Sequence, residues 1–316
     1  MMREAVIGGV KIGNGCPTFV VAEIGINHNG DLQLVKKLVD ATKAAGCQAV
    51  KFQKRTVSVV YTPEELAKPR EVPLGIIHQA ICRDVLSSEA LDRLYASEHK
   101  NTTNGDLKLA LELTRDEYRE IDLYCKEVGM IWFASPWDEA SVDFLEEFNP
   151  VCYKVASASL TDDILLRHIS STDRPVILST GMSTMEQIQR AVAILDEEKL
   201  VLLHCVSTYP AKLEELNLEV IRTLRSHNPE IPVGYSGHEK SLVPTLVAVA
   251  MGACVVERHI TLDRGMWGSD QGSSLEPKAF GELVDWIREC ESARGDGIKR
   301  VLESEVPIMK KLRRKG

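Results

Sequence analysis

Polar side chains suited to catalysis recur in this 316-residue sequence at the ends of short apolar runs. Histidine, lysine, glutamate and serine are the residue types that bind metals and anions and transfer protons. Singly, each has a structural alternative as a helix cap or a hydrogen-bonded core residue, but together they predict one site. The runs end in the following groups: Glu23; Lys51 and Gln53; Ser135 and Asp138; Lys154 and Ser157; Ser179 and Thr180; His204, Ser207 and Tyr209; Ser236 and His238; Glu257 and His259.

Two histidines predict a metal site. His238 and His259 end neighbouring runs, so both imidazoles could bind one divalent cation and leave positions for water and substrate. Glu257 lies two residues before His259 and therefore on the same face of a strand. There it could order the imidazole or a substrate hydroxyl. The sequence defines no third metal ligand.

Two lysines predict an anion site. Lys51 and Lys154 could present two positive charges, which suit a phosphate and a carboxylate. Ser157, Ser179 and Ser236 would add hydroxyl donors, so we expect a small dianion or trianion. A Schiff-base aldolase is the alternative, because a lysine on a barrel strand also serves as its nucleophile.

The first two runs belong to one strand, helix, strand unit at residues 19–53. Residues 19–24 and 49–53 are apolar and rich in β-branched side chains, while the segment between them has apolar residues at helical spacing. Asp31 could cap the start of this helix, and Gly46 suits a left-handed conformation just past its end.

The same alternation continues and predicts an α/β fold, a (β/α)8 TIM barrel with an N-terminal β-hairpin. The barrel fits the polar run ends, because active sites of this fold lie at the carboxyl ends of the strands. An open sheet would need a glycine-rich phosphate loop after the first strand, which EIGINHNG does not provide. Further strands are expected at 130–135, 151–157, 175–180, 200–205, 231–236 and 253–260, and helices near 114–128, 139–148, 161–169, 183 onward (with Ser183 and Glu186 as a capping box), 217–226, 241–251 and 277–291.

Length and composition complete the outline. We expect one barrel domain over residues 1–300, with a hairpin in 1–18 that covers the closed end, a long irregular insertion in 54–113, and a basic tail in 301–316. The net charge of −8 disfavours nucleic acid as a partner. No signal peptide or membrane span is recognisable, and the eight cysteines are single, so a soluble cytoplasmic protein with reduced thiols is expected.

Seven motifs in order resemble the sialic acid (N-acetylneuraminate) synthase family, from about residue 17 to residue 300. They are VAEIGINHNGD, VKFQ, YKVAS, LSTGMST, GYSGHE, VVERHITLD and GSDQGSSLEP. The resemblance implies a metal-dependent synthase that condenses phosphoenolpyruvate (PEP) with an N-acetylmannosamine-like aldose to give a sialic acid or a related nonulosonic acid. It also implies a cofactor, with Mn²⁺ favoured over Mg²⁺ or Co²⁺, and a homo-oligomer.

The resemblance also implies roles for individual residues. Glu23, Lys51, Lys154 and Glu257 would be catalytic, and His238 and His259 would hold the metal. PEP would be bound by Lys51, Gln53, Lys154, Ser157, Ser179, Ser207 and Ser236, and the sugar by Glu23, Tyr209 and Asp270.

Departures from the family pattern lie on the sugar side. Ser207 stands where the family often has asparagine, and WGSDQGSS (267–274) differs from the more usual Gly-Pro-Asp-His form. The family's C-terminal antifreeze-like domain is not recognisable, so a partner chain or the 54–113 segment is expected to supply its contacts, or the acceptor differs. The alternatives are a synthase that uses another or a phosphorylated aldose, and a catalytically silent barrel that serves as a binding subunit.

Overall fold

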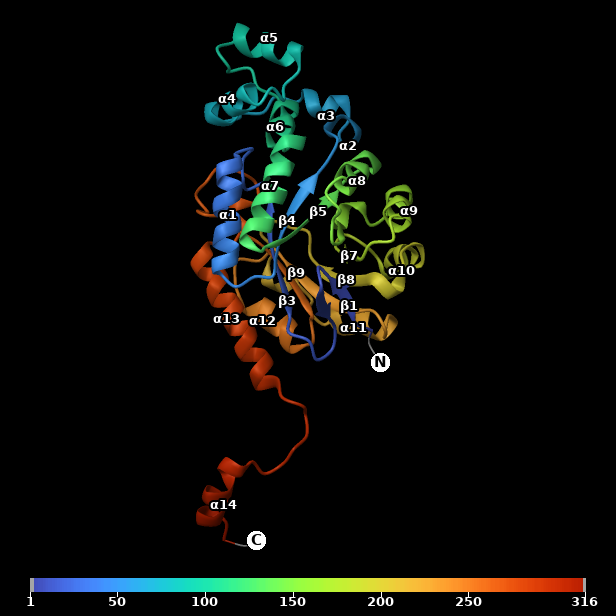
Figure 1. The fold of residues 1–316 in the computed structure, drawn as a ribbon, viewed down its shortest axis with the longest axis vertical. Coiled ribbons are helices and arrows are strands. Elements are labelled where there is room, and N and C mark those ends of the chain that lie inside the picture. Colours follow the sequence, from blue (N-terminus) through green and yellow to red (C-terminus); the bar gives the residue numbers. More distant parts are fainter. Residues whose placement is uncertain (1–2, 315–316) are drawn as a thin grey trace.

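The computed structural model describes residues 3–314, and eight parallel strands close into a barrel within them (Figure 1). This confirms the predicted (β/α)8 fold with its separate antiparallel hairpin. The hairpin strands are β1 (Ala5–Ile7) and β2 (Val10–Ile12). The barrel strands are β3 (Phe19–Gly25), β4 (Ala49–Lys54), β5 (Ile131–Pro136), β6 (Tyr153–Val155), β7 (Val176–Ser179), β8 (Leu200–Cys205), β9 (Val233–Gly237) and β10 (Val255–His259).

Helices surround the barrel and begin and end at local signals. Asp31 accepts hydrogen bonds from the backbone N–H groups of Gln33 and Leu34, and Gly46 follows the helix with φ +79°, as predicted. A capping box begins one later helix at Thr184 with Gln187, so the predicted box at Ser183 and Glu186 is wrong by one residue. The surrounding helices are α1 (Leu32–Ala44), α7 (Arg115–Val128), α8 (Glu139–Glu146), α9 (Asp163–Ser171), α10 (Met185–Ile194), α11 (Val220–His227), α12 (Val243–Ala250) and α13 (Pro277–Arg294).

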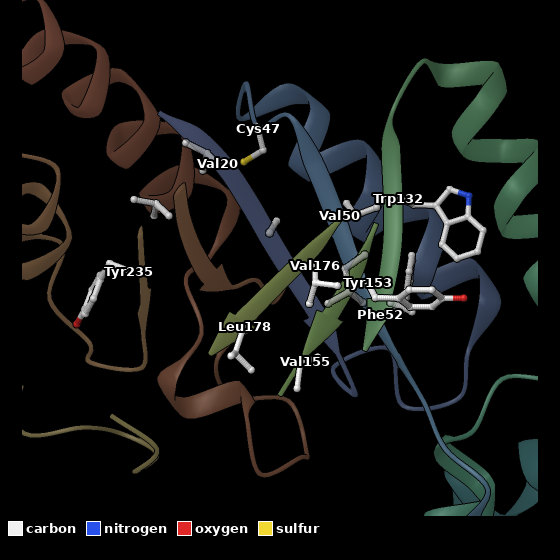
Figure 2. Packing of buried hydrophobic residues seen from close by; sticks show 14 of the residues in the cluster. Val20, Cys47, Val50, Phe52, Trp132, Tyr153, Val155, Val176, Leu178 and Tyr235 are labelled. Carbon is white, nitrogen blue, oxygen red and sulfur yellow. The ribbon is translucent and has the colours of Figure 1, made fainter. Parts of the chain in front are cut away.

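Strand alternation divides the barrel core into two layers. Outward side chains such as Val20, Val50 and Tyr153 pack between the strands and the helices (Figure 2). Inward side chains near the strand starts, such as Phe19 and Val21, pack with the hairpin in a second cluster. The hairpin therefore covers the amino-terminal end of the barrel, as expected, and the polar inward side chains lie towards the opposite end.

The segment between β4 and α7 is helical, so the prediction of an irregular stretch is wrong. Its elements are short: Pro63 begins α3 and Pro73 is the N-cap of α4, so the prolines mark the starts of helices that are too short to show a clear helical period. They surround a small apolar core that includes Ile77, Leu94 and Leu107, above the carboxyl end of the barrel (Figure 1). These helices are α2 (Val57–Val60), α3 (Pro63–Ala67), α4 (Leu74–Cys82), α5 (Ser88–Ala96) and α6 (Asn104–Leu111).

The chain after α13 leaves the barrel as an extended link and ends in α14 (Val306–Leu312), which lies apart from the rest of the molecule (Figure 1). Among residues 3–314, no helix is long and apolar enough to cross a membrane. Single 3₁₀ turns occur at η1 (Ser157–Ser159), η2 (Glu197–Lys199), η3 (Leu213–Glu215), η4 (Gln271–Ser273) and η5 (Glu303–Glu305).

Candidate active site

A cavity of about 290 Å³ opens at the carboxyl end of the barrel strands. The strand register sets the lining side chains next to one another: His259 pairs with Glu23, and Glu23 with Lys51. Of the residues to which the sequence assigned a catalytic, binding or metal role, Asp270 alone does not line the cavity, although its Oδ2 lies 3.8 Å from Nδ1 of His259. The predicted site residues that line it are Glu23, Lys51, Gln53, Lys154, Ser157, Ser179, Ser207, Tyr209, Ser236, His238, Glu257 and His259.

Three other polar strand-end residues have structural roles. Asp138 caps α8 through the N–H of Ser141 and also accepts hydrogen bonds from Thr56. Thr180 donates its hydroxyl to the backbone oxygen of Leu203. His204 is hydrogen-bonded to the backbone oxygen of Leu216. For these residues the structural alternative is correct.

Two lysines and two glutamates form a buried charge cluster on the cavity floor. Nζ of Lys51 lies 3.3 Å from Oε2 of Glu23 and 3.2 Å from Oε1 of Glu257. Nζ of Lys154 lies 3.7 Å from the same Glu257 oxygen and donates to the Ser179 hydroxyl at 2.6 Å. Each charge has an opposite charge within 4 Å, which is what allows the four groups to be buried together.

The two carboxylates differ in their protonation because their surroundings differ. Burial raises the pKa of Glu23 to about 7, although Lys51 opposes the shift. Burial would also raise the pKa of Glu257, but Lys154 and Lys51 together hold it well below its usual range. Glu257 therefore stays ionised, whereas Glu23 can accept and release a proton near neutral pH.

Gln53 joins Glu23 to the inserted helices. Its Nε2 donates to Oε1 of Glu23 at 2.8 Å, and its Oε1 accepts from Nη2 of Arg55. Nε of Arg55 lies 2.6 Å from Oε1 of Glu112, just after α6. Both ends of the Gln53 amide are thus engaged by protein groups, which favours a role in orienting Glu23 over direct contact with PEP.

The two histidines have the surroundings of metal ligands. Nδ1 of His238 lies 2.7 Å from the backbone oxygen of Val206, so the ring can donate there and keep its Nε2 lone pair. Nδ1 of His259 is buried without a hydrogen-bond partner, and the two ring centres are 5.4 Å apart. Burial lowers the pKa of His259, which keeps its ring neutral and able to bind a cation. Over residues 3–314, however, no three His, Cys, Asp or Glu side chains are grouped so that they could hold a metal ion.

Five lining residues were not predicted. Trp137, Ala156, Ala158, Met182 and Cys205 contribute apolar or thiol surface to the cavity. Trp137 and Cys205 lie at strand ends, like the predicted polar residues, so their positions in the sequence could have identified them. They were missed because only polar side chains were considered as site residues.

Comparison with known proteins identifies the family. The model of the NeuB family matches residues 77–299. The chain belongs to the NeuB family. This NeuB-family chain is 36% identical to N-acetylneuraminate-9-phosphate synthase of Homo sapiens. The match covers 96% of this chain and 79% of that relative.

Other NeuB-family relatives are named as synthases of different sugar acids. N,N'-diacetyllegionaminic acid synthase of Legionella pneumophila is 33% identical over 98% of this chain and 82% of its own length. Among solved structures, the sialic acid synthetase of Leptospira borgpetersenii in complex with citrate has a TM-score of 0.79 at 30% identity. The match covers 100% of this chain and 99% of that one. The resemblance noted in the sequence is thereby confirmed at the level of the family.

Proposed function

We propose that this chain condenses PEP with an open-chain aldose to give a sialic acid or a related 2-keto-3-deoxy nonulosonic acid and phosphate. The buried cluster of Lys51, Lys154, Glu23 and Glu257 is the observation that carries the proposal. Its two lysines suit the phosphate and carboxylate of PEP, and the cluster lies in the same cavity as two histidines. The names of the NeuB-family relatives support the same reaction class.

The residues have separate tasks in this reaction. Lys51 and Lys154 bind the anionic groups of PEP, helped by the hydroxyls of Ser157 and Ser179. C3 of PEP attacks the aldehyde carbon to form the new C–C bond, and the aldehyde oxygen takes up a proton. Water then adds at C2 and gives a proton to Glu23, after which the C2–O bond to phosphate breaks. One water is consumed: its oxygen becomes the C2 carbonyl oxygen, one of its protons passes through Glu23 to the oxygen of the former aldehyde, and the other leaves with phosphate.

We further propose that His238 and His259 hold a divalent cation, Mn²⁺ in preference to Mg²⁺ or Co²⁺. Such a cation would polarise the acceptor carbonyl. The unpartnered Nδ1 of His259 and the backbone hydrogen bond of His238 support this assignment.

The decisive experiment measures phosphate release from PEP in the presence of Mn²⁺. The acceptor panel contains N-acetylmannosamine, its 6-phosphate, and a diacetamido hexose, as the name of the N,N'-diacetyllegionaminic acid synthase suggests. Release that depends on one acceptor supports the proposal and names the substrate. The absence of release with every acceptor would contradict it and favour a catalytically silent barrel.

A Schiff-base aldolase has one observation in its favour, because burial lowers the pKa of Lys154 and so makes its amine more nucleophilic. Against it, Lys154 Nζ donates to Ser179 and lies within ion-pair distance of Glu257. Borohydride reduction in the presence of substrate separates the two mechanisms. We expect no covalent adduct on Lys154.

A further inference from the structure

A buried ion pair lies outside the barrel wall, behind β9, which His238 directly follows, and β10, which carries His259. Nη1 of Arg258 in β10 lies 3.0 Å from Oε1 of Glu239, and both side chains are fully buried. Strand alternation turns Arg258 outward, whereas its neighbours Glu257 and His259 line the cavity. Glu239 directly follows His238. The pair therefore joins the sequence neighbours of the two histidines.

Further hydrogen bonds tie the loop after β9 to β10. The Arg258 guanidinium donates to the backbone oxygens of Glu239 and Ser241, and to the hydroxyl of Thr245 on α12 at 2.7 Å. Oε2 of Glu239 accepts from the Tyr235 hydroxyl at 2.8 Å. The segment that carries His238 is thus held from behind by the strand that carries His259.

Gly237 allows this arrangement. A Cβ at this position would lie 2.8 Å from Oε2 of Glu239 and 2.7 Å from Cε1 of Tyr235. Any other residue would have to displace the Tyr235 ring and the Glu239 carboxylate, so glycine leaves room for the Glu239 carboxylate behind the sheet while His238 lines the cavity.

Stability alone is a poor explanation for such a pair, because the cost of removing two charges from water cancels much of their attraction. We infer that Arg258 and Glu239 are positioning residues that set the separation of His238 and His259 for a divalent cation. This inference rests on the proposed function, because it requires the cation. The inference gives a functional role to two charged residues that do not line the cavity.

The test compares Mn²⁺ affinities, measured from the electron paramagnetic resonance signal of free Mn²⁺ at a temperature where every variant is folded. Glu239→Gln keeps the shape of the side chain but removes its charge, and is expected to weaken Mn²⁺ binding about 10- to 100-fold. Tyr235→Phe removes one hydroxyl from the same carboxylate and should weaken binding less. This mild variant decides the question if Glu239→Gln does not fold.

A matched control exists on the opposite side of the barrel. Tyr153 in β6 is also outward-facing and fully buried, and its hydroxyl donates to Oε1 of Glu146 at 2.7 Å. Glu146 is in turn paired with Arg174 at 2.6 Å. This triad has the same residue types as Tyr235, Glu239 and Arg258, although Glu146 and Arg174 are partly exposed. Since β6 lies opposite β10 in the closed strand order, Tyr153→Phe should leave Mn²⁺ affinity unchanged.

The outcomes separate this inference from the proposed function. Wild-type affinity in folded Glu239→Gln and Tyr235→Phe would overturn the inference and leave the proposed function intact. An equal loss in Tyr235→Phe and Tyr153→Phe would also overturn it, because the effect would then belong to wall packing in general. If the wild type bound no Mn²⁺, the metal assignment would fall together with the inference.

Discussion

Replacing Gln53 by leucine tests whether Glu23 is the group that transfers protons. Gln53 donates one hydrogen bond of 2.8 Å to Glu23, whose pKa burial has raised to about 7. A hydrogen bond to an ionised group is worth about 1.5–3 kcal/mol. Since one pKa unit corresponds to about 1.4 kcal/mol, loss of this bond should raise the pKa of Glu23 by about 1–2 units, to about 8–9.

The assay is the pH dependence of kcat/KM for PEP, which reports the groups of the free enzyme. Glu23 acts as a base, so activity rises as pH increases through its pKa. In the variant the ionised fraction of Glu23 at pH 7 falls from about half to roughly 1–10%, and the acid limb moves to higher pH. Lys154 must stay charged to bind PEP, and burial lowers its pKa, so deprotonation of Lys154 sets the alkaline limb of the pH profile. The bell-shaped profile of the variant should therefore be narrower, because its acid limb moves toward this alkaline limb.

The refuting result is a uniform loss of rate with the acid limb unmoved. A higher KM for PEP with an unmoved limb would instead support the sequence-based hypothesis that Gln53 binds PEP directly. Arg55→Met is the graded control, because it removes the other partner of the Gln53 amide and leaves the bond to Glu23 in place. It should shift the limb less than Gln53→Leu.

Three further predictions concern the cation, the anion site and the insertion. His259→Ala should abolish Mn²⁺-stimulated turnover, and wild-type activity that survives chelation would contradict the metal assignment. Lys51→Met should raise KM for PEP about 10- to 100-fold, because it removes charge-assisted contacts of about 1.5–3 kcal/mol, while KM for the acceptor changes less; equal changes in both would contradict the PEP role. Arg83 pairs with Glu117 at 2.7 Å and donates to the backbone oxygens of Ala110 and Glu112. Arg83→Met should therefore lower the free energy of unfolding by roughly 3 kcal/mol in urea titrations, and an unchanged midpoint would refute this role.

The barrel could be predicted from the sequence because strand alternation and helix caps are local signals. Thr114 and Gly129, for example, bound α7 as their sequence positions predict. The inserted helices could not be predicted, because α2 has four residues and α3 five, too few to show a helical period. Their stability comes from a shared core contributed by residues far apart in the chain.

The site was predictable in outline and not in its hydrogen bonding. Residues at strand ends had to converge once the barrel closed, which is why Glu23, Lys51 and His259 could be grouped in advance. The sequence does not show that Gln53 connects Glu23 to Arg55, because that depends on side-chain orientation. Nor does it place Asp270, whose loop is fixed by tertiary contacts such as the hydrogen bond from the neighbouring Gln271 side chain to the backbone oxygen of Asn27.

The central claim is that PEP loses phosphate by C–O cleavage as it is joined to an acceptor sugar. The most direct measurement uses PEP labelled with ¹⁸O in the oxygen that bridges C2 and phosphorus, with mass spectrometry of both products. The account predicts acceptor-dependent release of phosphate that carries the label, together with a keto acid whose carbon skeleton is the sum of PEP and the aldose. Unlabelled phosphate, or release that needs no acceptor, would contradict it.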